Sequence, residues 1–180
     1  MSCRISRAAR SVAAVVFAAA SVGWAQIERL DLAQMVAKTD NAVLGKIVGK
    51  EVTRVDSPRD GPELYFTHLL IEGRSLYTGN AITVPVTFAG GFVRPGEGTW
   101  NSEAPSADDT QIGKQVVVFY KWTDNMGGDV AANALYAAHG GLYRVIEGRQ
   151  APIVLGRGDG YAIDKNITVA DLKAAIALLR

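Results

Sequence analysis

Apolar and polar residues alternate in short runs along most of the chain, and the runs are separated by glycine, proline and asparagine. The clearest run is 115–122, QVVVFYKW, which is typical of a buried strand. The runs 42–55, 64–72 and 81–88 are rich in β-branched, aliphatic and aromatic residues and also favour strands. Further short strands are expected at 134–138, 142–146, 152–155 and 161–163. The pattern therefore predicts six to eight short strands.

A helix is predicted near each end of this strand-rich region. Asp31 can cap a short helix over 31–39, with Gln34 as the reciprocal partner of a capping box. Thr168 can begin a final helix in a similar way, with Asp171 three residues further on. One face of this final helix is apolar, through Val169, Leu172, Ile176 and Leu179.

The predicted fold class is mainly β (α+β). Either a small closed barrel or a sandwich can bury such strands. Gly45 and Gly49 interrupt the first strand and indicate a bulge or a sharp bend. This glycine-broken strand favours an OB-like barrel of five strands with additional strands beside it.

The N-terminal segment has the three parts of a secretory signal peptide. Three arginines among the first ten residues precede the apolar run 11–22, and Gly23-Trp24-Ala25 follows with small residues at its first and third positions. The run is shorter than the roughly 20 apolar residues that span a bilayer. We therefore expect residues 1–25 to be a cleaved leader and 26–180 to form a single β-rich globular domain, exported to the periplasm or the medium.

Charge and cysteine content exclude several classes of protein. The leader carries three of the 19 Lys and Arg residues, so 16 remain against 18 Asp and Glu, a net charge of −2. A nucleic-acid partner or a polybasic membrane anchor is not expected with this balance. The single cysteine is Cys3, in the leader, so the mature chain is expected to fold without disulfides.

Short segments spread over most of the mature chain carry a resemblance. They are Asp31-Leu32 with Met35-Val36, 39–47, Tyr65-Phe66-Thr67, Phe88-Ala89-Gly90-Gly91, 112–119, 140–145 and 167–173. On these segments the chain resembles a family of uncharacterised exported bacterial proteins. The resemblance implies one signal-bearing β domain, and it implies no activity and no catalytic residues.

No arrangement of residues points to a reaction, a metal or a cofactor. His68 and His139 are the only histidines, one in a predicted strand and one in a glycine-rich turn, and nothing in the sequence places them together. A histidine metal site or a Ser-His-Asp triad is therefore not expected, and no serine stands in a Gly-x-Ser-x-Gly turn.

The stretch 89–114 is the longest without periodicity, and such long loops are often functional or mobile. Trp100 lies in it, where an aromatic side chain either plugs one end of the barrel or contacts a ligand. With Phe92 and Arg94 it forms our set of candidate ligand contacts. This leads to the hypothesis of a non-enzymatic binding or interaction module for an unknown envelope or extracellular protein or ligand.

Two alternatives remain. The same loop carries Glu97, Glu103, Asp108 and Asp109, which could serve a hydrolase of envelope polymers or peptides if two of them converge within roughly 5–10 Å. A structural role in envelope assembly predicts instead a large exposed apolar patch.

Overall fold

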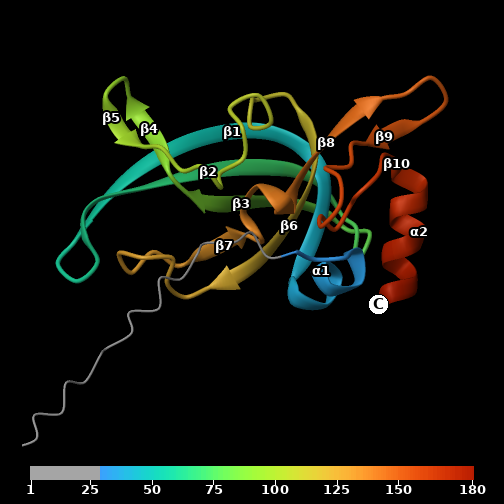
Figure 1. The fold of residues 1–180 in the computed structure, drawn as a ribbon, viewed down its shortest axis with the longest axis horizontal. Coiled ribbons are helices and arrows are strands. Elements are labelled where there is room, and N and C mark those ends of the chain that lie inside the picture. Colours follow the sequence, from blue (N-terminus) through green and yellow to red (C-terminus); the bar gives the residue numbers. More distant parts are fainter. Residues whose placement is uncertain (1–28) are drawn as a thin grey trace, which may run out of the picture.

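Five strands close into a barrel in the computed structural model, which describes residues 29–180 (Figure 1). They are β1 (Asn41–Ser57), β2 (Gly61–Ser75), β3 (Ala81–Ala89), β6 (Gln115–Thr123) and β7 (Ala132–Leu135). Neighbouring strands are antiparallel except β3 and β7, which pair in parallel at Thr87 and Ala134. β6 pairs back onto β1 and closes the barrel. When the five barrel strands are numbered 1 to 5 in chain order, they follow one another around the barrel as 1-2-3-5-4. The predicted fold class, mainly β and OB-like, is confirmed.

The barrel interior is filled by alternate residues of its strands. On β6, Val116, Val118 and Tyr120 point inward, as the two-residue period of a strand requires. They pack with inward residues of the other strands: Val43, Ile47, Leu69, Ile71, Val84, Val86, Phe88 and Leu135. Leu142, just beyond the barrel strands, completes this cluster.

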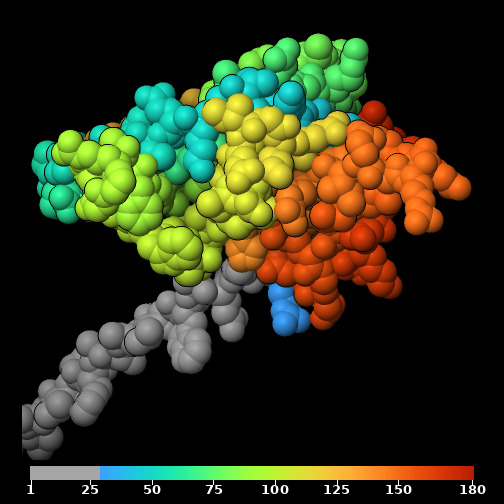
Figure 2. Space-filling view, turned by 90° about the horizontal axis from the view of Figure 1, so that it is seen from above, coloured from blue at the N-terminus to red at the C-terminus, as the bar shows by residue number. Residues whose placement is uncertain are grey.

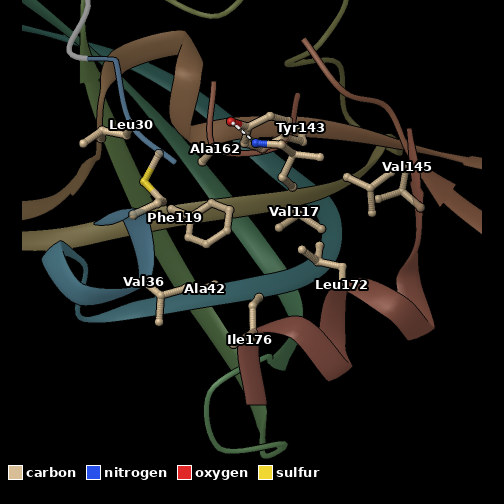
Figure 3. Close-up of a cluster of buried hydrophobic side chains, with 13 residues drawn as sticks. Leu30, Val36, Ala42, Val117, Phe119, Tyr143, Val145, Ala162, Leu172 and Ile176 are labelled. Carbon is tan, nitrogen blue, oxygen red and sulfur yellow. Dashed lines mark hydrogen bonds between the residues drawn. The ribbon is translucent and has the colours of Figure 1, made fainter. Parts of the chain in front are cut away.

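A second buried cluster lies on the outside of the barrel, against β1 and β6 (Figure 3). The residues that alternate with the inward set, such as Val117 and Phe119, pack there against Tyr143. The covering layer consists of α1 (Leu32–Lys38), β8 (Leu142–Glu147), β9 (Pro152–Val154), β10 (Ile167–Thr168) and α2 (Val169–Leu179). This explains why β6 is apolar on both faces.

Both helices begin as the capping patterns predict. The Asp31 carboxylate accepts from the Gln34 N–H (2.7 Å), and the Gln34 side chain accepts from the Asp31 N–H (3.0 Å). At α2, the Thr168 hydroxyl accepts from the Asp171 N–H (3.1 Å). Each cap satisfies a backbone donor that has no partner within the helix.

Two segments differ from the sequence-based expectation. The predicted strand at 161–163 is wrong, because this segment is irregular and pairs with no strand. Its apolar residues Ala162 and Ile163 are buried in the second cluster instead. The Ile163 N–H donates to the Tyr143 hydroxyl (3.3 Å) and not to a neighbouring strand. The stretch 89–114 contains a small hairpin of β4 (Gly91–Arg94) and β5 (Glu97–Thr99).

The strands β7 and β8 are joined by the 3₁₀ turn η1 (Ala138–Gly141) and pair with successive parts of the same edge of β6. The chain thereby passes from the barrel to the covering layer at β8. The predicted signal peptide, residues 1–25, lies outside the described residues. Within 29–180, no helix is both long and apolar enough to cross a membrane.

Candidate functional site

A β-bulge in β1 determines which side chains face the open end of the barrel. Ile47 opposes Ile71, but the next pair is Gly49 with Leu70, so Val48 is an extra residue in the register. Without the bulge Lys50 would oppose His68 on the outer face. With it, Lys50 opposes Leu69, which is buried in the barrel core. Because opposed side chains share a face, the bulge turns Lys50 inward.

Lys50 therefore lies at the mouth of the barrel, where the residue is exposed to solvent, and it has no ionic partner among residues 29–180. Its Nζ donates a hydrogen bond to the Thr110 hydroxyl (2.9 Å). No carboxylate of residues 29–180 forms an ion pair with it, and burial lowers its pKa from the usual value. Val52, two residues further along the same face, adds an apolar wall.

The β4–β5 hairpin forms one side of this mouth, and glycine allows its close approach. A Cβ on Gly91 would lie 2.4 Å from the Thr67 hydroxyl and 3.1 Å from Val52, and Gly91 has a φ of +130°. The hairpin can therefore start directly above β1 and β2. Phe92, the next residue, is exposed at the rim.

The segment 101–113, which we call the capping segment, forms the opposite side. Ala104 packs against the barrel core, and Asp109 is nearly buried. The Asp109 carboxylate accepts from Arg144 Nε and Arg157 Nη2, both at 3.0 Å. This pair of contacts ties the capping segment to the covering layer and fixes Thr110 beside Lys50. Figure 2 shows the capping segment (yellow-green to yellow) beside the hairpin (light green) and β1 (cyan).

Three adjoining hollows, which together we call the mouth groove, lie along the hairpin, the capping segment and the start of β2. The first, of about 450 Å³, is lined by Phe92, Val93 and Ile112. The second, of about 260 Å³, shares Lys50 and Phe92 with the first. The third, of about 350 Å³, lies beyond Trp100 and shares that residue with the second. Because neighbouring hollows share wall residues, the three adjoin one another in this order.

The structure brings two of the three predicted contact residues to the mouth groove. Trp100 is 80% exposed and lines two of the hollows, so it does not plug the barrel. Phe92 is 50% exposed and lines the other shared wall. Arg94 does not line any of the three hollows, and its guanidinium pairs with Glu97.

Three of the four loop carboxylates make side-chain contacts of their own, and Glu103 is engaged through its backbone. Glu97 pairs with Arg94 and also lies 3.6 Å from Arg54 Nη1. Asp109 is engaged by its two arginines, and Asp108 accepts from the Gln111 side chain (3.1 Å). The backbone carbonyl of Glu103 accepts from the His139 N–H (2.8 Å). These contacts tie two of the carboxylates into ion pairs that hold the hairpin and the capping segment.

The two histidines lie in different settings. His68 is on the outer face of β2, where Nε2 and Nδ1 bond the hydroxyls of Thr53 (2.9 Å) and Thr87 (2.8 Å). His139 Nε2 bonds the Tyr161 hydroxyl (2.8 Å). Over the part of the chain that the structure describes, no three His, Cys, Asp or Glu residues form a group able to hold a metal ion.

Sequence reasoning missed Lys50, Thr110 and Ile112 as residues of this site. The signal for Lys50 was present in Gly45 and Gly49, which indicated a bulge. A bulge reverses the alternation of every residue after it, so the inward set changes from Val43 and Ile47 to Lys50 and Val52. Thr110 and Ile112 were missed because they lie in a segment without hydrophobic periodicity, where the sequence does not indicate which way a side chain points.

Barrel and groove together define a small OB-like β-barrel protein with an open, aromatic-walled depression at one end. Comparison of the chain with protein-family models, with curated proteins and with solved structures finds no match.

Proposed function

We propose that this chain is an exported binding module that holds its ligand in the mouth groove. The observation that carries the proposal is the gathering of exposed large apolar side chains along this one depression. They are Phe92, Val93, Trp100 and Ile112. Exposed apolar patches with a polar rim mark interaction sites, and tryptophan is the residue most enriched among binding hot spots.

The shape of the groove supports a ligand that is extended and chain-like. Its three hollows follow one another past Phe92 and Trp100 rather than forming one enclosed cavity. The walls come from structured elements: β1, the β4–β5 hairpin and a capping segment anchored by Asp109. A site held on such elements needs little reordering when the ligand binds.

The sequence of the leader supports the location. Its arginines, its apolar run 11–22 and the small residues of 23–25 favour cleavage before Gln26. Together with the segments that resemble exported bacterial proteins, this supports a ligand that is present in the periplasm or the medium. A ligand there is a component of the envelope or of the surroundings.

Site-specific photo-cross-linking tests the proposal in cells that express the full chain. A benzophenone amino acid replaces Phe92, and in a matched control it replaces Trp122, which is half-exposed on β6 and lines none of the three hollows. We expect irradiation to produce a heavier adduct at position 92 that is lost in Trp100→Ala. Equal adducts at both positions, or none at position 92, contradict the proposal.

A further inference from the structure

Lys50 gives the mouth groove a chemical preference that its aromatic walls do not. Lys50 lines the first two hollows, and among the described residues no acidic one lines either of them, whereas Glu63 lines the third. The Lys50 side chain is held in place by its hydrogen bond to Thr110, and Thr110 in turn is fixed by the turn that begins at Ser106. The groove thus contains a positioned cation that is partly exposed and forms no ion pair with any residue of 29–180.

The number of cations restricts the kind of anion. Among the residues that the structure describes, Lys50 is the only lysine or arginine that lines any of the three hollows. A nucleic acid or polyphosphate is held by several such groups, because each phosphate brings a charge. One cation suits a ligand with isolated single charges, such as a carboxylate, which forms a short charge-assisted hydrogen bond with an ammonium group.

The remaining walls suit a hydroxyl-rich ligand with flat apolar faces. Phe92 and Trp100 present exposed aromatic rings, which combine a large contact area with little loss of side-chain freedom. Apart from Lys50, the polar lining of the first two hollows consists of hydroxyl and amide side chains: Thr67, Thr99, Asn101, Ser106, Thr110 and Gln111. The third hollow adds Tyr65 and Ser102, and also the carboxylate of Glu63 at the end away from Lys50. Hydroxyl and amide groups both donate and accept hydrogen bonds, as the hydroxyls of a sugar do.

We propose that the mouth groove binds a linear acidic glycan, with a ring carboxylate on Lys50 Nζ and neighbouring sugar rings against Phe92 and Trp100. This rests on the proposed binding function and names its ligand class. Because Lys50 lines the groove and forms no ion pair within residues 29–180, a bound carboxylate would supply its ionic partner, so the cation contributes selectivity for acidic over neutral sugars.

Calorimetric titration of the full chain with defined glycans tests this. The probes are oligosaccharides of polygalacturonate and of polymannuronate, each beside its carboxyl-reduced neutral form, with polyglutamate as an acidic peptide. We expect binding of at least one acidic glycan, and binding of its reduced form to be about tenfold weaker or more, because one charge-assisted hydrogen bond is lost.

Variants separate the charge from the aromatic walls. Lys50→Met removes the charge and keeps a side chain of similar length. It should weaken binding of the acidic glycan about tenfold and leave binding of the neutral form unchanged, whereas Lys50→Arg should keep most of the affinity for the acidic glycan. Trp100→Ala should weaken both forms. Two variants serve as controls and should change neither the affinity for the acidic glycan nor that for the neutral form. They are Trp122→Phe and Lys173→Met, the latter on α2, which lies at the opposite end of the molecule from the hairpin (Figure 1).

The other outcomes are equally informative. If the neutral forms bind as well as the acidic ones and Lys50→Met has no effect, the inference is overturned while the binding function stands. Polyglutamate binding as tightly as the acidic glycan would assign the groove to an acidic peptide instead. Failure of every acidic glycan to bind also overturns the inference, whereas the binding function itself fails only if the cross-link at position 92 is absent or unspecific.

Discussion

Replacing Asp109 by alanine tests whether the capping segment is held by its ion pairs. The Asp109 side chain is 10% exposed and contacts Arg144 and Arg157, each at 3.0 Å. Arg157 also donates to the Leu142 carbonyl from Nε (3.0 Å) and Nη2 (2.9 Å). Removal of the carboxylate leaves both guanidinium groups in place without their anion, and one of them is largely enclosed.

The magnitude follows from how well water reaches each arginine. Removing one partner of a buried pair costs about 3–5 kcal/mol. Arg157 is 24% exposed and Arg144 41% exposed, so solvent screens the second contact and reduces its share. We therefore expect Asp109→Ala to lower the free energy of unfolding by about 2–4 kcal/mol, a substantial part of the roughly 5–15 kcal/mol typical of a domain.

Urea unfolding followed by tryptophan fluorescence and by far-UV circular dichroism measures this loss. With a slope of about 2 kcal/mol per molar urea, the midpoint should fall by about 1–2 M. Asp108→Ala is the matched control, because Asp108 is exposed and accepts only from Gln111, and it should cost no more than about 0.5 kcal/mol. If Asp109→Ala costs as little as Asp108→Ala, the ion pairs do not hold the segment and our reasoning is refuted.

Three further predictions concern other parts of the chain. A Cβ on Gly73 would lie 2.1 Å from the Leu44 carbonyl oxygen, so Gly73→Ala should cost about 1–3 kcal/mol in urea unfolding. Gly49→Ala, whose Cβ would meet only a side chain, at 3.3 Å, should cost less, and equal losses contradict the prediction. Burial lowers the pKa of His68 below its ordinary value of 6.5. The free energy of unfolding should therefore be highest above pH 6.5 and should fall as the pH drops from 6.5 through the lowered pKa. His68→Gln should flatten this dependence in unfolding curves measured across that range, and parallel curves count against it. Mass spectrometry of the chain expressed in a bacterium should find Gln26 at its N-terminus, and an intact leader rejects the signal-peptide prediction.

Local patterns were sufficient for most of the elements. The run QVVVFYKW at 115–122 predicted β6, and the pairs Asp31 with Gln34 and Thr168 with Asp171 predicted both helix starts. These features depend on residues within a few positions of one another, through strand alternation and capping hydrogen bonds. They can therefore be recognised without knowing what the element packs against.

The number of buried layers could not be recognised in this way. The sequence pattern predicted a single β-rich domain, and the structure of that region has two buried clusters on opposite faces of β1 and β6. An apolar run such as 116–120 shows that both faces are covered, but it does not say by what. The cover comes from β8, β9, β10 and the helices, which are separated from β1 by long stretches of chain.

The candidate site was predicted only in part for a related reason. Trp100 and Phe92 stood out because aromatic residues are conspicuous in a glycine-rich loop, and both line the groove. Arg94 stood out equally but pairs with Glu97, and an ion pair of this kind is not visible from residue type. Lys50 was missed because its direction depends on one extra residue in the pairing of β1 with β2.

By itself, the sequence determined the strand-rich class, the glycine-broken first strand, the two helix starts and the aromatic residues of the long loop. Each of these depends on interactions between near neighbours in the chain. The tertiary structure alone decided that Lys50 faces the barrel mouth with no ion-paired carboxylate among residues 29–180, that Asp109 lies between two arginines, and that the hairpin and capping segment border an open groove. These depend on strand register and on contacts between distant segments, where a shift of one residue reverses the face on which a side chain lies.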